Sequence, residues 1–175
     1  MALKRCLGLF PLILVTLLAF CANAGASELE QFLSQENLAK VFPDADHVGD
    51  TGGQPPSAPV FHDNRLIGYV YLTSDVVNST GYSGKPVKIL AGFDLAGVIT
   101  GAIVVEHQEP ILVLGIPDSA LDTFIAQFKG KDLRRRVRVG APAADGESAV
   151  DMVSGASITS LVSSDSVMRA GRSVA

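Results

Sequence analysis

Two apolar, β-branched runs separated by a short turn constrain the fold of this chain more than any other feature of its sequence. The runs cover residues 86–93 and 98–105, and Asp94-Leu95-Ala96-Gly97 separates them. Strands of this length joined by so short a turn pair as an antiparallel hairpin. A further strand is expected over residues 65–72, and a short buried strand over residues 111–114. The middle of the chain therefore predicts a sheet.

Helical patterns flank this region. Residues 28–41 carry apolar side chains at helical spacing, with Ser27 as a cap and Pro43 as a stop. A second helix is expected over residues 118–129, with Asp118 or Ser119 as its cap, Gly130 after its end, and an apolar stripe of Leu121, Phe124, Ile125 and Phe128. A last helix is expected from Ile158 onward. Helices at the ends of a chain around a central run of strands favour an α+β fold with a mainly antiparallel, twisted sheet flanked by helices.

The first residues have the pattern of an export signal. Lys4 and Arg5 precede an apolar run over residues 7–20 and then Ala22-Asn23-Ala24. The run is shorter than the roughly 18 apolar residues of a membrane-spanning helix. We therefore expect a signal peptide over residues 1–24 and a periplasmic location, with cleavage after Ala26 as the alternative site. An uncleaved signal that anchors the protein to the membrane remains a second possibility.

Cysteine content and charge exclude several classes of function. Both cysteines, Cys6 and Cys21, lie in the predicted signal, so the exported part has no disulfide, thiol catalyst or cysteine-ligated metal. Without Lys4 and Arg5, 12 basic side chains face 18 acidic ones, a net charge of about −6 that disfavours contact with nucleic acid. The basic run over residues 134–138 is expected to be a solvated strand or loop face, with a docking patch for an acidic partner or anionic lipid as the alternative.

A cluster of small and hydroxyl residues over 154–160 opens the last predicted helix. Ser157 or Thr159 at a helix N-terminus places a hydroxyl beside free backbone N–H groups, which is a geometry that binds phosphate. Gly155 and Ala156 allow a bulky anion to approach the backbone. An ordinary helix cap explains the same residues, so the pattern alone leaves both interpretations open.

This segment resembles the acceptor motif for covalent flavinylation, in which a flavin transferase moves FMN from FAD onto the hydroxyl that follows Gly-Ala. Asp151 matches the leading acid, Ser154-Gly155-Ala156 the core, and Ser157 the acceptor, where most relatives have threonine. The resemblance implies that FMN is held covalently, as a phosphoester on Ser157. Thr159 is the secondary candidate for attachment.

A second stretch is similar to the NqrC/RnfG-like FMN-binding domains of Na⁺-pumping quinone reductases and Rnf complexes. It comprises the turn Gly81-Tyr82-Ser83-Gly84, the hairpin at residues 94–97, and a strand that ends in His107-Gln108-Glu109. The usual Thr-Pro-Gly-x-Gly continuation is absent, and residues 106–112 instead resemble the variant of the NosR/NirI family, regulators tied to nitrous oxide respiration. There a periplasmic flavin domain precedes membrane helices and iron–sulfur modules.

The resemblance implies a domain layout and a set of site residues. Residues 28–58 are expected to form an N-terminal helix and loop, and residues 60–175 an FMN-binding domain that belongs to a longer chain. The cofactor-binding residues implied are Ser157, Asp151, Ser154, Gly155, Ala156, Thr159, Tyr82, Gly84, His107 and Glu109. From the residues alone, His107 can equally be a hydrogen-bonded structural residue, and Glu109 can lie on a solvated face, orient His107 or face a flavin edge. No metal site is expected, because His47 and His62 lack partners at ligand spacing.

The implied function is that of an electron carrier rather than a self-contained enzyme. FMN carries the redox chemistry, a flavin transferase loads it, and redox partner proteins in the membrane or periplasm exchange electrons with it. Within a NosR/NirI-type protein this carrier supports the expression or activity of nitrous oxide reductase. The alternative is a cofactor-free sensory or interaction domain with the same fold. A hydrolase built from Ser157, His107 and Asp151 is disfavoured, because the chain has no Gly-x-Ser-x-Gly elbow.

Overall fold

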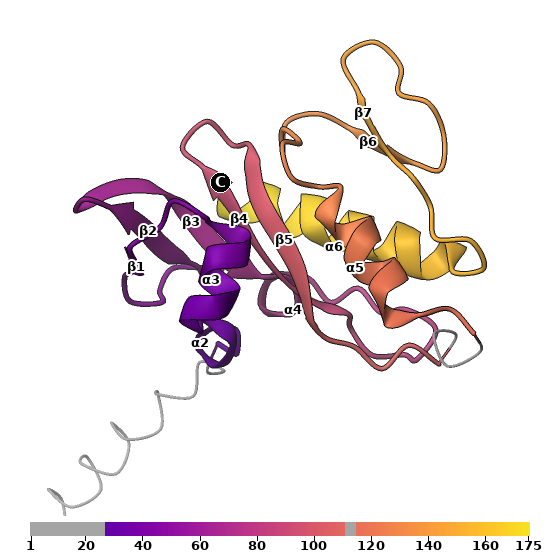
Figure 1. The fold of residues 1–175 in the computed structure, drawn as a ribbon, viewed down its shortest axis with the longest axis horizontal. Coiled ribbons are helices and arrows are strands. Elements are labelled where there is room, and N and C mark those ends of the chain that lie inside the picture. Colours follow the sequence, from indigo (N-terminus) through magenta and orange to yellow (C-terminus); the bar gives the residue numbers. More distant parts are fainter. Residues whose placement is uncertain (1–26, 111–114) are drawn as a thin grey trace, which may run out of the picture.

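A five-stranded antiparallel sheet organises the fold (Figure 1). A computed structural model of the chain describes residues 27–110 and 115–175. The strands pair in sequence order, each antiparallel to the next: β1 (His47–Val48), β2 (Ala58–His62), β3 (Arg65–Leu72), β4 (Lys88–Asp94) and β5 (Ile99–Glu106). The predicted α+β class and the predicted hairpin between β4 and β5 are confirmed.

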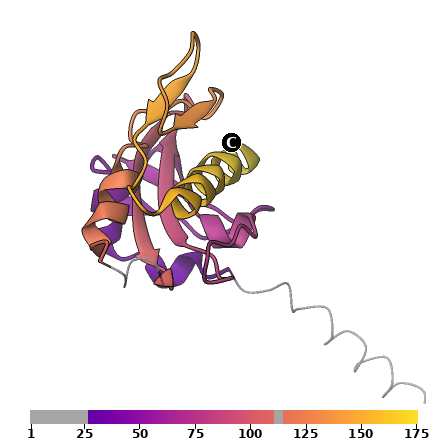
Figure 2. The same ribbon diagram turned by 90° about the vertical axis from the view of Figure 1, so that its right-hand side faces the viewer.

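Helices cover both faces of this sheet. Two short helices, α2 (Leu29–Phe32) and α3 (Gln35–Val41), lie on one side, and the long helix α6 (Ser157–Val174) lies on the other (Figures 1 and 2). The short helix α4 (Thr73–Val76) follows β3, and α5 (Asp118–Ala126) packs on β5. The strands β6 (Val137–Val139) and β7 (Ser148–Val150) pair in parallel and form a small ribbon that projects beyond α5 and α6 (Figure 2).

Alternation along the strands explains why both faces are buried. Successive side chains of a strand point to opposite faces of the sheet. Tyr71, Ile89 and Phe93 therefore join α5 and α6 in one core, while Val70 and Leu90 join α2 and α3 in the other. The two cores place the N-terminal helices and the C-terminal helix on opposite sides of the same strands.

A glycine lets α3 approach the sheet directly. Gly92 of β4 pairs with Gly101 of β5 in the hairpin register. A Cβ atom on Gly101 would lie 2.7 Å from the carbonyl oxygens of Lys40 and Val41. Because no side chain fits there, the last turn of α3 packs against the sheet backbone.

The predicted N-terminal helix over residues 28–41 is wrong in one respect, because the structure splits it. α2 ends at Phe32, and α3 begins after Ser34, whose Oγ accepts a hydrogen bond from the Asn37 N–H at 3.2 Å. Ser34 is therefore the cap that sequence reasoning missed. Ser27 does accept from the Leu29 N–H, at 3.2 Å.

The first two strands of the sheet were not predicted. β1 and β2 fall where a loop and a domain boundary were expected, and residue 60 lies inside β2. Pro59 argued against a strand in the sequence, because proline has no N–H to donate to a neighbouring strand. Its carbonyl oxygen nonetheless accepts from the Gly49 N–H at 2.8 Å. The N-terminal segment therefore shares one sheet with the rest of the described chain.

Two further predictions are corrected in the second half. α5 begins after Pro117 with no side-chain cap, so neither Asp118 nor Ser119 caps it, and it ends at Ala126 rather than at residue 129. β6 overlaps the end of the basic run, where a strand or loop was expected, and β7 was not predicted. The arginines of the basic run are exposed, as both a solvated face and a docking patch require. The signal over residues 1–24 and the strand over residues 111–114 lie outside the described residues.

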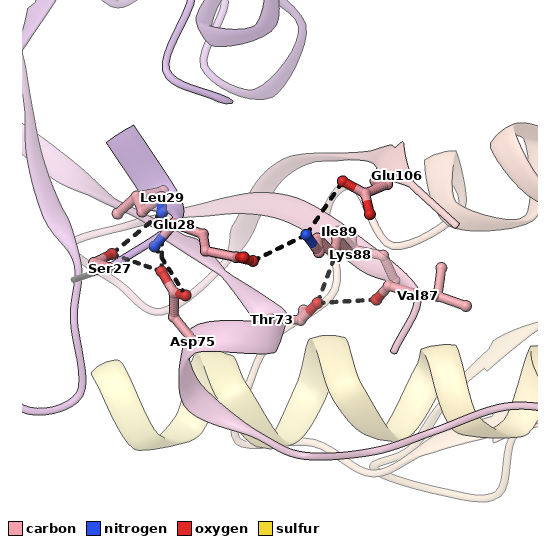
Figure 3. A network of polar contacts seen from close by, with 9 residues as sticks. All are labelled: Ser27, Glu28, Leu29, Thr73, Asp75, Val87, Lys88, Ile89 and Glu106. Atoms are coloured by element: carbon pink, nitrogen blue, oxygen red, sulfur yellow. Dashed lines mark hydrogen bonds and ion pairs between the residues drawn. The ribbon is translucent and has the colours of Figure 1, made fainter. Parts of the chain in front are cut away.

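A polar network fastens the start of the described chain to the sheet (Figure 3). The Asp75 carboxylate accepts from the Ser27 hydroxyl at 2.6 Å and from the N–H groups of Glu28 and Leu29 at 3.1 and 2.9 Å. Lys88 lies 3.0 Å from the Glu28 carboxylate and 3.1 Å from that of Glu106. These contacts hold α2 against β4 and β5.

Candidate functional site

A buried carboxylate joins two segments that sequence reasoning selected separately. Glu109 follows β5 and is 2% exposed. Its Oε2 accepts from the Thr159 hydroxyl at 2.8 Å and from the Tyr82 N–H at 3.2 Å. Its Oε1 accepts from the Ser83 hydroxyl at 2.9 Å and from the Ser83 N–H at 3.3 Å. The turn over residues 81–84 and the first turn of α6 therefore meet at one side chain.

These donors keep Glu109 ionised. Burial alone would raise the pKa of the Glu109 carboxyl, because a carboxylate is poorly solvated away from water. The hydrogen bonds from Thr159, Ser83 and Tyr82 oppose burial, and together they hold the pKa of Glu109 below its usual range. A buried charge satisfied in this way is a fixed structural element rather than a reactive acid.

The start of α6 presents one hydroxyl outward and one inward. Ser157, the first residue of the helix, is exposed, whereas Thr159 is 1% exposed and bonded to Glu109. Ala156 is at the N-cap and offers no side-chain cap. Because the first N–H groups of a helix have no partners within it, the N-terminus of α6 beside Ser157 can take an anion.

The loop before α6 is braced from inside. Ser160 is fully buried, and its Oγ accepts from the Val153 N–H at 3.1 Å and donates to the Ala156 carbonyl oxygen at 3.0 Å. Gly155 has φ of +81°, a backbone conformation that side chains disfavour, and a Cβ there would lie 3.2 Å from Ile116. The loop that precedes Ser157 is therefore narrow and closely fitted.

A groove of about 500 Å³ opens between this loop and α5. Ser154 lines one side, and a volume of this size lies within the range of pockets that hold small organic ligands. The lining is mainly apolar with a few polar groups: Gly115, Ile116, Pro117, Ser119, Ala120, Thr123, Phe124, Gln127, Met152 and Val153. Sequence reasoning missed these residues, because packing of α5 against the loop brings them together and no local motif records it.

The remaining residues of the implied set are distributed around this centre. Asp151 is exposed, and its N–H donates to the Gln127 side-chain oxygen at 2.7 Å. Tyr82 is 53% exposed, and Gly84 has φ of +70° in the same turn. Ser83, which was not singled out in the sequence, supplies two of the four hydrogen bonds to Glu109. Its position inside the Gly-Tyr-x-Gly turn was the available signal.

His107 stands apart from the Glu109 contacts. Its Nε2 lies 3.8 Å from Asp118 at the start of α5, and its side chain is 22% exposed. Its Nδ1 is buried without a hydrogen-bond partner among the described residues. The expected orientation of His107 by Glu109 is not observed, because the four hydrogen bonds to Glu109 come from Tyr82, Ser83 and Thr159.

The site fits a flavin mononucleotide in its chemistry. The uncapped N-terminus of α6 suits a phosphate group, and the mainly apolar groove beside Ser154 suits a planar ring system. Over residues 27–110 and 115–175, His, Asp and Glu side chains form no cluster of three able to hold a metal ion. Within the same ranges, none of the helices has the length and apolar character needed to span a membrane.

Several proteins of known family have sequences similar to this one. Over 171 residues the chain is 37% identical to the regulatory protein NosR of Pseudomonas aeruginosa, an alignment that covers 98% of this chain and 23% of that protein. It is 32% identical to the regulatory protein NosR of Stutzerimonas stutzeri over 93% of this chain and 22% of that protein. The protein NirI of Paracoccus denitrificans is 32% identical over 69% of this chain and 17% of its own length. The chain thus spans less than a quarter of these relatives.

A family model of the FMN-binding domain matches residues 81–171. The match begins at the turn held by Glu109 and ends within α6, so it contains both segments of the site. With the antiparallel sheet, the braced loop and the NosR and NirI relatives, it leaves one conclusion. This chain belongs to the family of FMN-binding domains and is a homologue of the corresponding part of NosR and NirI proteins.

Proposed function

We propose that this chain is an exported electron-transfer domain that carries FMN as a covalent phosphoester on the Ser157 hydroxyl. One observation carries the proposal: of the two hydroxyls considered for attachment, Ser157 is exposed at the start of α6, and Thr159 is buried and engaged by Glu109. A large transferase can reach only an accessible oxygen.

The attachment transfers the FMN group of FAD to the chain. The Ser157 oxygen forms a new bond to the FMN phosphorus of FAD, the pyrophosphate bond breaks, AMP leaves, and the hydroxyl proton passes to the solvent. Serine supplies the same oxygen nucleophile as the threonine of related motifs. The N–H groups at the start of α6 stabilise the phosphoester charge. Asp151 is exposed beside the loop, where the transferase can read it.

The chain's own residues hold and orient the cofactor, while FMN supplies the one- and two-electron chemistry that side chains lack. Ser154 and the apolar wall of Ile116 and Met152 line the groove next to the attachment point. Tyr82 offers an exposed aromatic ring near the same end of α6, because its N–H shares the Glu109 Oε2 with Thr159. A covalent bond keeps the flavin with a domain outside the cytoplasm.

Support for the proposed wider role comes from the relatives. Similarity to proteins named regulatory protein NosR supports a contribution to the expression or activity of nitrous oxide reductase, with electrons exchanged through redox partners in the membrane or periplasm. A basic, apolar N-terminal signal supports a periplasmic location. The net negative charge of the exported chain disfavours direct contact with nucleic acid.

The test is to produce the protein with its signal in bacteria that contain a flavin transferase, and to weigh the purified chain. We expect a mass increase of one FMN less one water, with yellow colour and flavin fluorescence that survive denaturation. Ser157→Ala should remove all three signals, and Ser157→Thr should keep them. A colourless wild-type protein of unmodified mass, produced beside an active transferase, would overturn the proposal in favour of the cofactor-free domain.

A further inference from the structure

We propose that Glu109 is a positioning residue that fixes the rotation of the first turn of α6, so that the Ser157 hydroxyl faces outward for modification. This inference rests on the proposed function, since it concerns how the acceptor of that reaction is presented. It assigns Glu109 no contact with FMN. Glu109 acts through Thr159 on one side and through the turn over residues 81–84 on the other.

The link to Thr159 sets the orientation of Ser157. Residues two positions apart on an α-helix point in directions roughly 200° apart. The hydrogen bond of 2.8 Å from the Thr159 hydroxyl to Glu109 holds Thr159 against the core. Ser157 must then point to the opposite side, where it is exposed. Without the link, the first turn loses its side-chain contact with the segment after β5 and keeps only the Ser160 contacts with Val153 and Ala156.

The link to the turn gives Glu109 a rigid base. Two consecutive backbone N–H groups, those of Tyr82 and Ser83, point at its carboxylate together with the Ser83 hydroxyl. The turn closes tightly around the carboxylate, since a Cβ on Gly81 would lie 2.6 Å from the Glu109 carboxyl carbon. Tyr82 and Thr159 share the same oxygen, so the turn and α6 cannot move independently while both bonds persist.

The chemistry of this position requires a carboxylate. The Glu109 carboxylate is the acceptor in all four hydrogen bonds, and each of its two oxygens accepts two of them. The amide of glutamine would place its NH₂ group against at least one donor. Glu109→Gln keeps the shape of the side chain but breaks part of the network, which isolates the role of the charge.

Threonine variants separate positioning from general stability. Thr159→Val keeps the shape but removes the donor, and Thr159→Ser keeps the donor. Thr73→Val is a matched control: Thr73 is equally buried, and its hydroxyl bridges the Val87 carbonyl and the Ile89 N–H at the start of β4 (Figure 3). It should lower stability without affecting Ser157.

The experiment measures two quantities on the full exported chain. The first is hydrogen exchange of the Tyr82 and Ser83 amides in unloaded protein. The second is the initial rate at which purified transferase adds FMN from FAD, followed by intact mass. We expect Glu109→Gln and Thr159→Val to speed exchange and to slow FMN addition by about tenfold each. Thr159→Ser and Thr73→Val should stay near the wild-type rate.

The outcomes distinguish this inference from the proposed function. A wild-type chain that accepts no FMN overturns the proposed function and, with it, the positioning of an acceptor. A wild-type chain that accepts FMN while Thr159→Val accepts it equally fast overturns only the positioning role. Slowing by Thr73→Val to the same degree as by Thr159→Val also overturns it, because loss of stability alone would then explain the effect.

Discussion

The hydroxyl of Thr159 donates a hydrogen bond of 2.8 Å to the carboxylate of Glu109, fifty residues earlier in the chain. The contact joins the end of β5 to the start of α6, and the turn over residues 81–84 completes it through Tyr82 and Ser83. Three segments that are distant in sequence thus form one polar centre next to Ser157. This centre yields predictions about both stability and flavin loading.

Acid should destabilise the protein partly through Glu109. Its folded pKa is lowered from 4.5, so its contribution to stability is present above the unfolded value and is lost as the pH falls through the folded value. Urea unfolding from about pH 7 to about pH 3 should therefore show a steeper loss of stability for wild type than for Glu109→Gln. Asp46 and Asp132 also have lowered pKa values. Both residues are present in wild type and in Glu109→Gln, so they do not account for a difference between the two pH profiles. Parallel pH profiles would contradict the assignment.

Gly81→Ala should distort the turn through Glu109. The new Cβ would lie 2.6 Å from the carboxyl carbon of Glu109, and crowding of this kind costs about 1–3 kcal/mol of unfolding free energy. Gly84→Ala is the control: nothing lies within 4 Å of its Cβ, and only its φ of +70° is strained. A double-mutant cycle with Glu109→Ala should show coupling of at least about 0.5 kcal/mol for Gly81 and none for Gly84. Equal coupling at both positions would contradict this account.

Gly101→Ala should displace α3 from the sheet. Its Cβ would lie 2.7 Å from the backbone oxygens of Lys40 and Val41, which cannot rotate away. We expect a loss of about 1–3 kcal/mol in unfolding free energy, measured by urea titration. Gly52→Ala, whose Cβ meets nothing within 4 Å, should change stability by less than about 0.5 kcal/mol. Flavin loading should persist in both variants, since α3 lies on the face of the sheet opposite α6.

Asp75→Ala should release the start of the described chain from the sheet. The N–H groups of Glu28 and Leu29 lose a charged acceptor, which costs about 1.5–3 kcal/mol. Hydrogen exchange should rise at residues 28–33 while α6 stays protected. Ser27→Ala removes one donor to Asp75 and one of the two acceptors of the Leu29 N–H, and it should have a smaller effect because the Asp75 carboxylate still accepts from both N–H groups. Protection at residues 28–33 that is unchanged in Asp75→Ala would show that Asp75 does not fasten this segment.

The sequence predicted elements that depend on local signals. Two apolar, β-branched runs and the turn at residues 94–97 predicted the β4–β5 hairpin, and an apolar stripe with Phe124 and Phe128 predicted α5. β1 and β2 were missed, because a two-residue strand and a proline-containing strand are stabilised by their neighbours rather than by their own pattern. The spacing of apolar residues predicted one helix over residues 28–41, whereas Ser34 lies between α2 and α3 and caps the second.

The candidate site likewise combines residues that short motifs predicted with contacts that only the folded chain creates. The turn residues and the loop before Ser157 were selected from short motifs. The role of Glu109 required the fold, because its partners come from the turn over residues 81–84 and from α6. The groove wall from α5 depends on packing between helix and loop, and it left no trace in local sequence. The engagement of Thr159 is likewise tertiary: a motif offers two hydroxyls, and only the folded chain distinguishes the buried one.

Peptide mass spectrometry on protein matured beside an active flavin transferase can locate the covalent flavin on the chain. Cleavage after Arg138 and Arg169 gives a peptide that contains Ser154, Ser157, Thr159 and Ser160. We expect this peptide to carry the mass of one FMN less one water, with fragmentation placing the addition on Ser157. The same peptide without added mass, or with the addition on Thr159, would contradict the proposed attachment to Ser157.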